Sequence, residues 1–252
     1  MAAEAAGIHI ALSPYILGEV MGLPITATLV TTWVVMALML VSSVLFYRSL
    51  KLAPGKGQSA VELAIIGVYD YMREVLEDDA LARKYFPLIM TLFVFVAGAN
   101  LFGLLPFVGG AIGLYGVHGH EGLTPLLYPV HTDLNMALAM AVVAVLAIEF
   151  AGITALGVWR YASKFINFHS AIGFTVGIIE LVSEIARLIT FSFRLFGNIF
   201  AGKVLILVAL FFLPYLLPVP LLVYEVAVAV IQGAVFALLT LFFIKIAVTE
   251  PH

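Results

Sequence analysis

The sequence predicts an all-α integral membrane protein with five membrane-embedded helices and one amphipathic helix at the membrane interface. Of its 252 residues, 63% are hydrophobic and only 11% are charged, which is typical of a polytopic membrane protein and not of a soluble domain. Several apolar stretches are also long enough to cross a hydrocarbon core roughly 30 Å thick. We therefore expect residues 1–252 to form a single membrane domain whose core is the bilayer-embedded bundle.

The composition excludes several kinds of chemistry. The chain has no cysteine, which rules out disulfides, thiol catalysis and thiolate metal sites. It has neither a glycine-rich phosphate-binding loop ending in Lys-Ser or Lys-Thr nor a nucleophile constellation. His118, His120 and His131 lack acidic or thiol ligands at a suitable spacing, so a solvated loop is preferred to a metal site there. We expect no catalytic site, cofactor, metal ion or nucleic-acid partner.

The first half of the chain is predicted to contain two spans joined by an amphipathic helix. Residues 1–24 form an external segment, and residues 25–47 form a span without a charged residue. Over residues 58–79, charged and apolar residues fall on different faces of a helix. That pattern suits a helix on the membrane surface, a helix packed on the bundle, or an ordinary surface helix. The second span covers residues 86–107, and a loop follows at 108–132.

The second half is predicted to contain a third span and two longer helices. The third span covers residues 133–159 and includes an intramembrane acid, Glu149. Residues 171–213 and 215–248 each exceed the roughly 20 residues that a perpendicular span needs. Each of these helices is therefore either strongly tilted or broken into a span and a surface segment. Three prolines predict the turn of a hairpin between them: Pro214, Pro218 and Pro220.

The distribution of basic residues predicts the orientation. Eight of the twelve lysines and arginines flank loops that alternate onto one side: Arg48, Lys51, Lys56, Arg73, Arg83, Lys84, Arg160 and Lys164. The opposite loops, 1–24 and 108–132, contain none. The positive-inside rule then places the N-terminus outside and the C-terminus in the cytoplasm.

One face of the helix over residues 171–213 is polar. At 100° per residue, its polar positions share a face with one aromatic residue: Glu180, Glu184, Arg187, Phe191, Arg194 and Asn198. A charge near the bilayer centre costs about 2.5–3.5 kcal/mol, so such a group is kept only where protein shields it or function uses it. Glu184 and Arg187, three residues apart, are expected to neutralise each other, with a transport role as the alternative.

Three segments resemble one family. The stretch Arg194-Leu195-Phe196-Gly197-Asn198, followed by Ala201-Gly202, resembles the signature of subunit a (the subunit 6 family) of rotary F-type ATP synthases. The segments from Asn100 to Pro106 and from His131 to Asn135 resemble two further parts of that family, and the resemblance covers most of the chain from about Asn100 onward. It implies an ion-conducting stator subunit of a bacterial plasma (inner) membrane. Its last two helices would form a tilted hairpin against a rotor ring of small c-type proteolipid hairpins. Peripheral-stalk subunits of the b type and the lipid bilayer would be its other partners, and H⁺ the ion it translocates.

The resemblance also implies which residues carry protons. Arg194 would be the essential arginine, Asn198 and Gln232 its neighbours, Glu225 a titratable group of the outer half-channel, and Glu180 the inner exit. Accessory candidates are Asn100, Asp133, Glu184, Lys203 and Glu149.

Two accessory candidates depart from the family pattern. Relatives commonly have an acid or a histidine at the position of Lys203, which is expected either to pair with Glu225 or to extend toward solvent. Glu149 is expected to pair with an arginine on a neighbouring helix or to contribute to the proton path.

Other readings of the same residues remain open. In one such reading, Arg194 is a structural ion-pair partner. In another, Asn198 and Gln232 only join two helices by hydrogen bonds. The alternative function is a self-contained secondary transporter in which Arg194 binds an anionic substrate. Against it, the chain shows no inverted repeat and only five spans.

Overall fold

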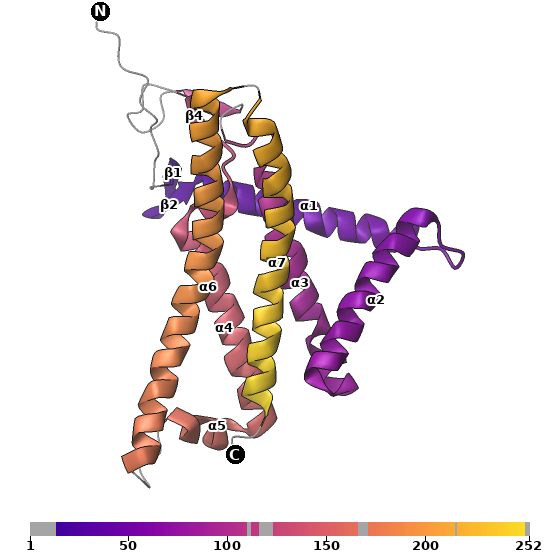
Figure 1. Cartoon of the computed structure of the whole chain (residues 1–252), viewed down its shortest axis with the longest axis vertical. Coiled ribbons are helices and arrows are strands. Elements are labelled where there is room, and N and C mark those ends of the chain that lie inside the picture. The colour runs from indigo at the N-terminus through magenta and orange to yellow at the C-terminus, as the bar shows by residue number, and fades with distance from the viewer. Residues whose placement is uncertain (1–13, 110–111, 116–122, 166–170, 215, 250–252) are drawn as a thin grey trace, which may run out of the picture. The chain divides into compact units, whose positions relative to one another are not determined.

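The computed structural model describes residues 14–109, 112–115, 123–165, 171–214 and 216–249. Among these residues, five helices are long and apolar enough to cross a membrane, which confirms the predicted all-α membrane class. They are α1 (Ala27–Ser49), α3 (Asp79–Gly103), α4 (Leu134–Leu156), α6 (Ala171–Phe212) and α7 (Pro218–Val248), labelled in Figure 1. Two further helices, α2 (Lys56–Leu76) and α5 (Val158–Phe165), connect them.

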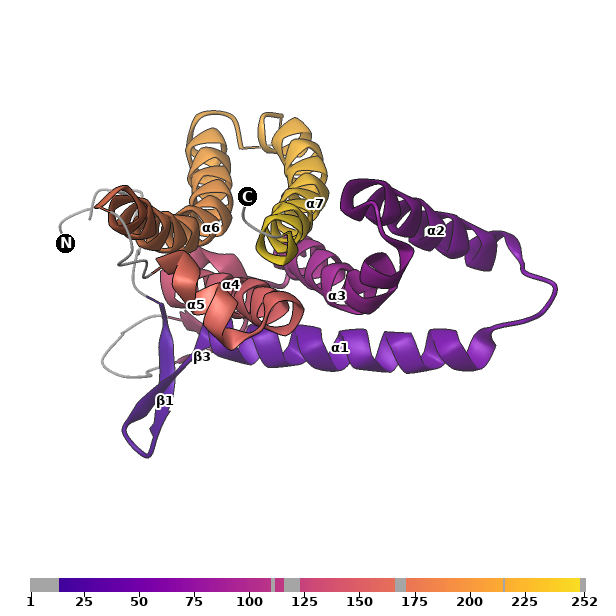
Figure 2. The same cartoon turned by 90° about the horizontal axis from the view of Figure 1, so that it is seen from below.

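Two short antiparallel hairpins interrupt the helical pattern, and the sequence analysis predicted neither of them. β1 (Ile16–Val20) pairs with β2 (Leu23–Thr26) directly before α1, as Figure 2 shows. Met21 (φ 53°) and Gly22 (φ 82°) occupy the two positions of its turn, where a two-residue hairpin loop favours positive φ. β3 (Gly113–Tyr115) pairs with β4 (Leu123–Pro125) in the segment between α3 and α4. His118 and His120 lie outside the described residues.

The chain forms two compact units, and each of the five long helices contributes to both. Unit 1 comprises the described residues within Met1–Val35, Ala97–Ala137 and Ser192–Gln232. Unit 2 comprises those within Met36–Val96, Leu138–Phe191 and Gly233–His252, and it holds all of α2 and α5.

Unit 1 buries several hydroxyl groups at the start of α1, and each has a partner. The Thr28 hydroxyl donates to Asp133 Oδ2 at 2.9 Å, and Thr31 Oγ1 accepts the backbone N–H of Tyr128 at 2.9 Å. Asp133 also caps α4, because its Oδ1 accepts the backbone N–H of Asn135 at 2.9 Å. Buried polar groups are costly unless they are hydrogen-bonded, so these bonds position the segment before α4 against α1.

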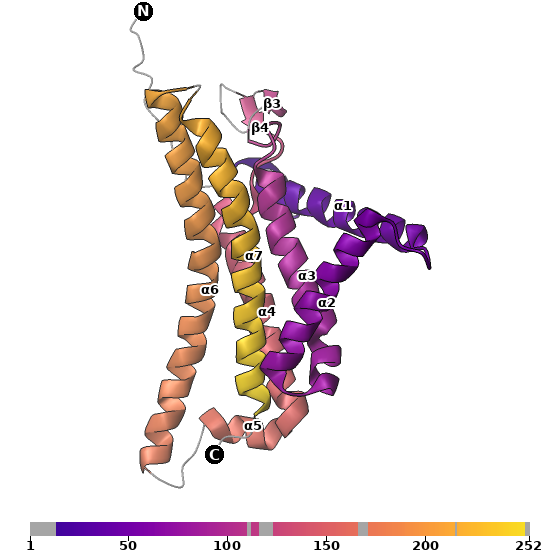
Figure 3. The same cartoon turned by 45° about the vertical axis from the view of Figure 1, so that its right-hand side comes forward.

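The second part of α6 and the first part of α7 run antiparallel and side by side in unit 1 (Figures 1 and 3). α7 begins at Pro218, with Pro220 in its first turn. A proline is tolerated there because the first N–H groups of a helix have no acceptor within that helix. The prolines predicted to form the hairpin turn therefore also define the start of α7.

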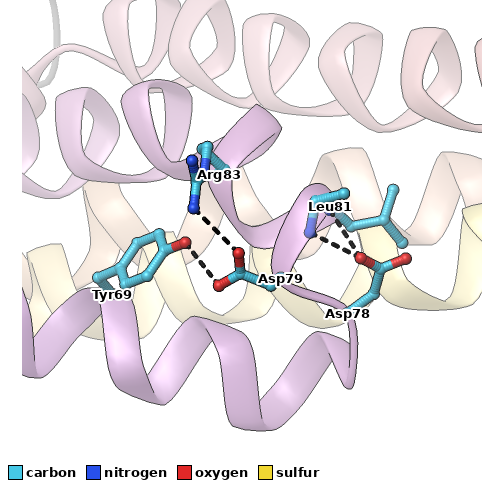
Figure 4. Close-up of polar contacts among 6 residues, drawn as sticks. Tyr69, Asp78, Asp79, Leu81 and Arg83 are labelled. Carbon is cyan, nitrogen blue, oxygen red and sulfur yellow. Dashed lines mark hydrogen bonds and ion pairs between the residues drawn. The ribbon is translucent and has the colours of Figure 1, made fainter.

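In unit 2, the junction between α2 and α3 is held by local polar contacts (Figure 4). Asp78 Oδ1 accepts the backbone N–H groups of Ala80 and Leu81, at 2.7 and 3.3 Å, and so caps α3. Asp79 accepts a hydrogen bond from the Tyr69 hydroxyl at 2.9 Å and pairs with Arg83 at 3.1 Å. α2 and α3 thus form a helical hairpin, which is visible in Figure 3.

The last turn of α7 is tied to the end of α2. Lys245 Nζ donates to Glu77 Oε1 at 2.7 Å, and this contact lowers the pKa of the Glu77 carboxyl. Glu77 itself has a left-handed conformation (φ 56°), with which it caps the C-terminus of α2. The pair is exposed, so its contribution to stability is small.

α4 ends at Leu156, three residues before the predicted end of the third span at 159. Gly157 has φ +83°, a left-handed conformation that ends the helix without strain, and α5 begins at the next residue. The ring of Tyr161 lies against Gly152, where any Cβ would overlap it. The chain therefore folds back at Gly157, and α5 crosses the end of α4 (Figure 2).

We predict that Thr28→Val destabilises the protein by about 1–3 kcal/mol, because it removes the donor to Asp133 Oδ2 inside the bundle while keeping the side-chain shape. Thermal unfolding of the purified protein in mild detergent measures the effect. Thr91→Val is the matched control, since Thr91 is exposed and bonds only to the Pro87 carbonyl of its own helix. Equal melting temperatures for the two variants would contradict the structural role of the Thr28 bond.

Candidate functional site

The structure brings together two of the predicted site residues, Asn198 of α6 and Gln232 of α7. The Asn198 amide donates from Nδ2 to Gln232 Oε1 at 2.6 Å. Gln232 is buried, and its own Nε2 has no partner among the described residues. The contact is a hydrogen bond between two facing helices, of the kind that joins helices inside membranes.

Arg194 lies one helical turn before Asn198 on α6. It is half-buried, and its Nη1 atom is buried without a hydrogen-bond partner in the described part of the chain. The hydrogen bond in the structure joins the two amides to each other, as expected for residues that link two helices, and the expectation that they also orient Arg194 stays a prediction. The unpaired groups of this site, Arg194 Nη1 and Gln232 Nε2, are both donors. No described residue therefore gives either of these two donor atoms an acceptor.

A cavity of about 570 Å³ opens beside α6 and α7 in unit 1. The ends of α3 and of the segment before α4 also line it, and we call it the α3–α7 cavity. Its walls are mostly aliphatic, and its polar side chains are Asn100, Thr132, Lys203 and Glu225. Three of the predicted channel residues, Asn100, Lys203 and Glu225, thus share one cavity.

Glu225 lies against the backbone of α6. Its residue surface is only 5% exposed, and a Cβ placed on Gly202 would overlap both carboxylate oxygens. Only glycine leaves room for the carboxylate here, because every other residue carries a Cβ. Gly202 therefore permits the close approach of a charged side chain of α7 to α6.

The Lys203 ammonium lies over the ring of Tyr128, with Nζ 3.4 Å from the ring centroid. Nζ is buried and donates no hydrogen bond to any oxygen of the described residues. Neither alternative expected for Lys203 is found in this structure, because Nζ neither pairs with Glu225 nor reaches solvent. The face of an aromatic ring attracts a cation electrostatically, by about 2 kcal/mol or more where the cation is desolvated, and this attraction replaces the expected ion pair.

Asn100 is held by a histidine that the sequence analysis had placed in a solvated loop. His131 Nδ1 and Asn100 Oδ1 are 2.6 Å apart, and both residues are buried. Burial lowers the pKa of His131 to about 4, so the imidazole is neutral at neutral pH. A neutral imidazole that donates from Nδ1 to the Asn100 oxygen fixes the orientation of that amide at the cavity wall.

Asp133 is occupied by structural bonds. Both of its carboxylate oxygens accept hydrogen bonds, one from Thr28 and one from the Asn135 backbone, and Asp133 does not line the α3–α7 cavity. These contacts support a structural role for this accessory candidate.

The remaining candidates belong to unit 2. Glu184 and Arg187 form an ion pair at 2.7 Å with side chains only 12% and 9% exposed, which confirms their predicted pairing. The Arg187 guanidinium also lies over the Phe243 ring, 4.0 Å from its centroid. Glu180 is half-buried on the same helix.

Glu149 lies beside Tyr161 of α5. Its Oε1 atom is buried and has no hydrogen-bond partner among the residues that the structure describes. Burial and the neighbouring Glu149 carboxylate raise the pKa of Tyr161. Neither Tyr161 nor Tyr128 is predicted as a site residue from the sequence. Tyr128 is far from Lys203 in the sequence, and Tyr161 lies on a different helix from Glu149. Each contact therefore depends on how separate segments fold together, which residue spacing along one helix does not show.

Comparison with known proteins identifies relatives over most of the chain. The family model described as ATP synthase A chain matches residues 29–245. ATP synthase subunit a of Moorella thermoacetica is 30% identical over 222 residues, which cover 88% of this chain and 90% of that protein. The subunits a of Geotalea daltonii and Campylobacter fetus are each 29% identical, over 221 and 217 residues. Those matches cover 88% and 85% of this chain, and 87% and 88% of the relatives.

We predict that Gly202→Ala lowers the stability of the α6–α7 pair by about 1 kcal/mol, because the added methyl group overlaps the Glu225 carboxylate and forces that flexible side chain out of its position against α6. Gly197→Ala is the matched control on the same helix, since no atom of the described chain lies within 4 Å of a Cβ there. Thermal unfolding in detergent compares the two. A Gly202→Ala protein that melts at or above the Gly197→Ala temperature would show that the close approach is not needed.

Proposed function

Because the chain belongs to the ATP synthase A chain family, we propose that it conducts protons through two half-channels that Arg194 keeps apart. The chain is a multi-pass integral membrane protein and a non-catalytic stator subunit of an F-type ATP synthase. This family assignment replaces the alternative of a self-contained secondary transporter. The proposal concerns how the subunit moves protons and with which residues.

The observation that carries the proposal is the set of unpaired donors around Asn198. Arg194 Nη1 and Gln232 Nε2 are buried donors without an acceptor in the described chain. A buried donor left without a partner costs about 1–3 kcal/mol, and more when it is charged. A carboxylate supplied by another subunit would accept from both, and a guanidinium binds a carboxylate through two parallel hydrogen bonds. The site thus has the chemistry to receive the ionised carboxylate of a rotor helix.

The charge of the guanidinium explains how such a site divides two half-channels. A guanidinium keeps its proton in proteins, so Arg194 neither carries protons nor lets them leak. At about 4 Å and an effective dielectric constant of about 20, it attracts a carboxylate by about 4 kcal/mol. A protonated carboxyl group that approaches Arg194 therefore releases its proton to one half-channel and is reloaded from the other after it has passed. Each proton that crosses 100 mV contributes about 2.3 kcal/mol, which drives rotation.

The outer half-channel of this proposal uses the α3–α7 cavity. Asn100 and Glu225 line that cavity within unit 1, so both are in contact with the space that water would fill. Glu225 is its proposed relay, because a carboxyl group exchanges protons near neutral pH more readily than an amide or an ammonium does. The inner half-channel uses Glu180. Glu184 is left out of the relay because it is already paired with Arg187.

The proposed partners are a ring of c-type proteolipid hairpins, b-type peripheral-stalk subunits and the lipid bilayer. An apolar face along α6 supports a partner there, because large exposed apolar surfaces mark contacts with protein or lipid. Six aliphatic residues of this face are about half exposed: Ile178, Ile179, Leu181, Val182, Ile185 and Ile189. The proposed location is a bacterial inner membrane with the N-terminus outside and the C-terminus in the cytoplasm, as the basic loops predict.

Replacing Arg194 tests the central claim. We predict that Arg194→Ala abolishes ATP synthesis and ATP-driven proton pumping while the complex still assembles, because no uncharged residue forces a rotor carboxyl group to ionise. Arg194→Lys should fail as well, since an ammonium lacks the planar fork and loses its proton more readily when desolvated. The measurements are pumping and ATP synthesis in inverted membrane vesicles, with a blot for assembled complex. Arg48→Ala, an exposed arginine at the end of α1, is the control. Normal synthesis by an assembled Arg194→Ala complex would overturn the proposal.

The inner half-channel has a separate test. We predict that Glu180→Gln slows proton pumping by about tenfold without preventing assembly, because it removes one relay group at the inner mouth. Glu180 precedes Arg194 by roughly 21 Å of helix, so the variant leaves the central barrier intact. Glu74→Gln on α2, where the glutamate is exposed, is the control. A pumping rate equal to that of the control would remove Glu180 from the proton path.

A further inference from the structure

The α3–α7 cavity contains one ammonium group and one carboxylate that do not meet. Lys203 and Glu225 both line it. The Glu225 carboxylate lies against the backbone of Gly202, the residue directly before Lys203. A lysine carries its ammonium on a flexible four-carbon chain, so the carboxylate is within its reach. Opposite charges inside an apolar environment attract strongly, and their separation needs a physical cause.

That cause is the ring of Tyr128. The Lys203 ammonium lies 3.4 Å from the ring centroid and has no hydrogen-bond partner among the described residues. Tyr128 is itself held in place: its backbone N–H donates to Thr31 Oγ1 at 2.9 Å, and its ring packs edge-on against Tyr15, with 5.0 Å between centroids. The ring is therefore a fixed platform for the ammonium.

The ring is also electrically neutral. Burial, and secondarily the contact with Tyr15, raise the pKa of the Tyr128 phenol to about 12. At neutral pH the phenol is not ionised, so Lys203 binds a neutral aromatic face and not a phenolate. A phenylalanine ring offers the same kind of face, whereas an aliphatic side chain offers none.

We propose that Tyr128 is a positioning residue that holds the Lys203 ammonium away from Glu225 and thereby keeps the Glu225 carboxylate free to exchange protons. An ion pair with Lys203 would stabilise the charged carboxylate and weaken its affinity for a proton. The cation–π contact removes that competitor while it leaves the carboxylate in the cavity. This inference rests on the proposed role of Glu225 in the outer half-channel.

The test uses the complete ATP synthase in inverted membrane vesicles, with four variants of this chain: Tyr128→Leu, Tyr128→Phe, Tyr128→Leu combined with Lys203→Met, and Glu225→Gln. ATP-driven proton pumping is measured by quenching of a pH-sensitive dye and is normalised to assembled complex by blot. Tyr128→Leu should pump about three- to tenfold more slowly than Tyr128→Phe, because only the phenylalanine ring still binds the ammonium. Adding Lys203→Met to Tyr128→Leu should restore most of the rate, since it removes the group that competes for Glu225.

Two results would overturn the inference. The first is equal pumping by Tyr128→Leu and Tyr128→Phe, which would show that the aromatic face has no role. The second is a slow Tyr128→Leu complex that Lys203→Met does not rescue, which would show that Tyr128 acts only by packing. If Tyr128→Leu does not assemble, Tyr128→Met replaces it in the same comparison, because methionine fills irregular space without an aromatic face.

Glu225→Gln separates this inference from the proposed function. Slow pumping by Glu225→Gln retains Glu225 as the outer relay, whatever the Tyr128 variants show. Normal pumping by Glu225→Gln would remove Glu225 from the proton path. It would then also contradict the proposed role of Tyr128, which depends on Glu225 as a relay.

Discussion

A guanidinium inside an apolar helix is the constraint on which the site depends. Placing a charge at the centre of a bilayer costs about 2.5–3.5 kcal/mol even on the most lenient scale, and Arg194 cannot reduce that cost by losing its proton. The facing helix, α7, contributes the amide of Gln232, which is hydrogen-bonded to Asn198 one turn beyond the arginine. The pair of amides joins α6 to α7, while Arg194 Nη1 has no hydrogen-bond acceptor among the described residues. In the proposed mechanism, the ionised carboxylate of a rotor helix supplies that acceptor.

α6 and α7 accommodate buried charged side chains because a glycine or an aromatic ring lies where each charged group makes its contact. Gly202 lets the Glu225 carboxylate lie against the backbone of α6. Lys203 and Arg187 each place a cation over an aromatic face, of Tyr128 and Phe243 respectively. An aromatic face attracts a cation without taking a proton from it and without offering a proton site of its own. The chain thus stabilises buried cations while it limits the number of groups that exchange protons.

The cavity beside α3 depends on the segment that connects α3 to α4. The segment between α3 and α4 provides Tyr128 and His131, and it is held to α1 through Thr31 and, by way of Asp133, through Thr28. Neutral His131 in turn orients the Asn100 amide. A short connecting segment therefore sets the polar lining of a cavity whose walls are otherwise aliphatic. Functional groups are often found on connecting segments that a rigid scaffold of helices holds in place, and this cavity follows that rule.

The sequence by itself determined the features that depend on neighbouring residues. Five apolar stretches predict the helices that cross the membrane, and the three-residue spacing of Glu184 and Arg187 predicts their ion pair, because a helix places such residues on one face. The motif around Arg194 identifies the family for the same reason, since its spacing along one helix is readable in the chain. Only the tertiary structure decided which distant groups meet. Lys203 lies over Tyr128 and not beside Glu225, and Glu149 lies beside Tyr161 of α5, which begins after the left-handed Gly157. Such contacts join segments far apart in the chain, and their geometry follows from how helices and connecting segments pack, which no local periodicity encodes.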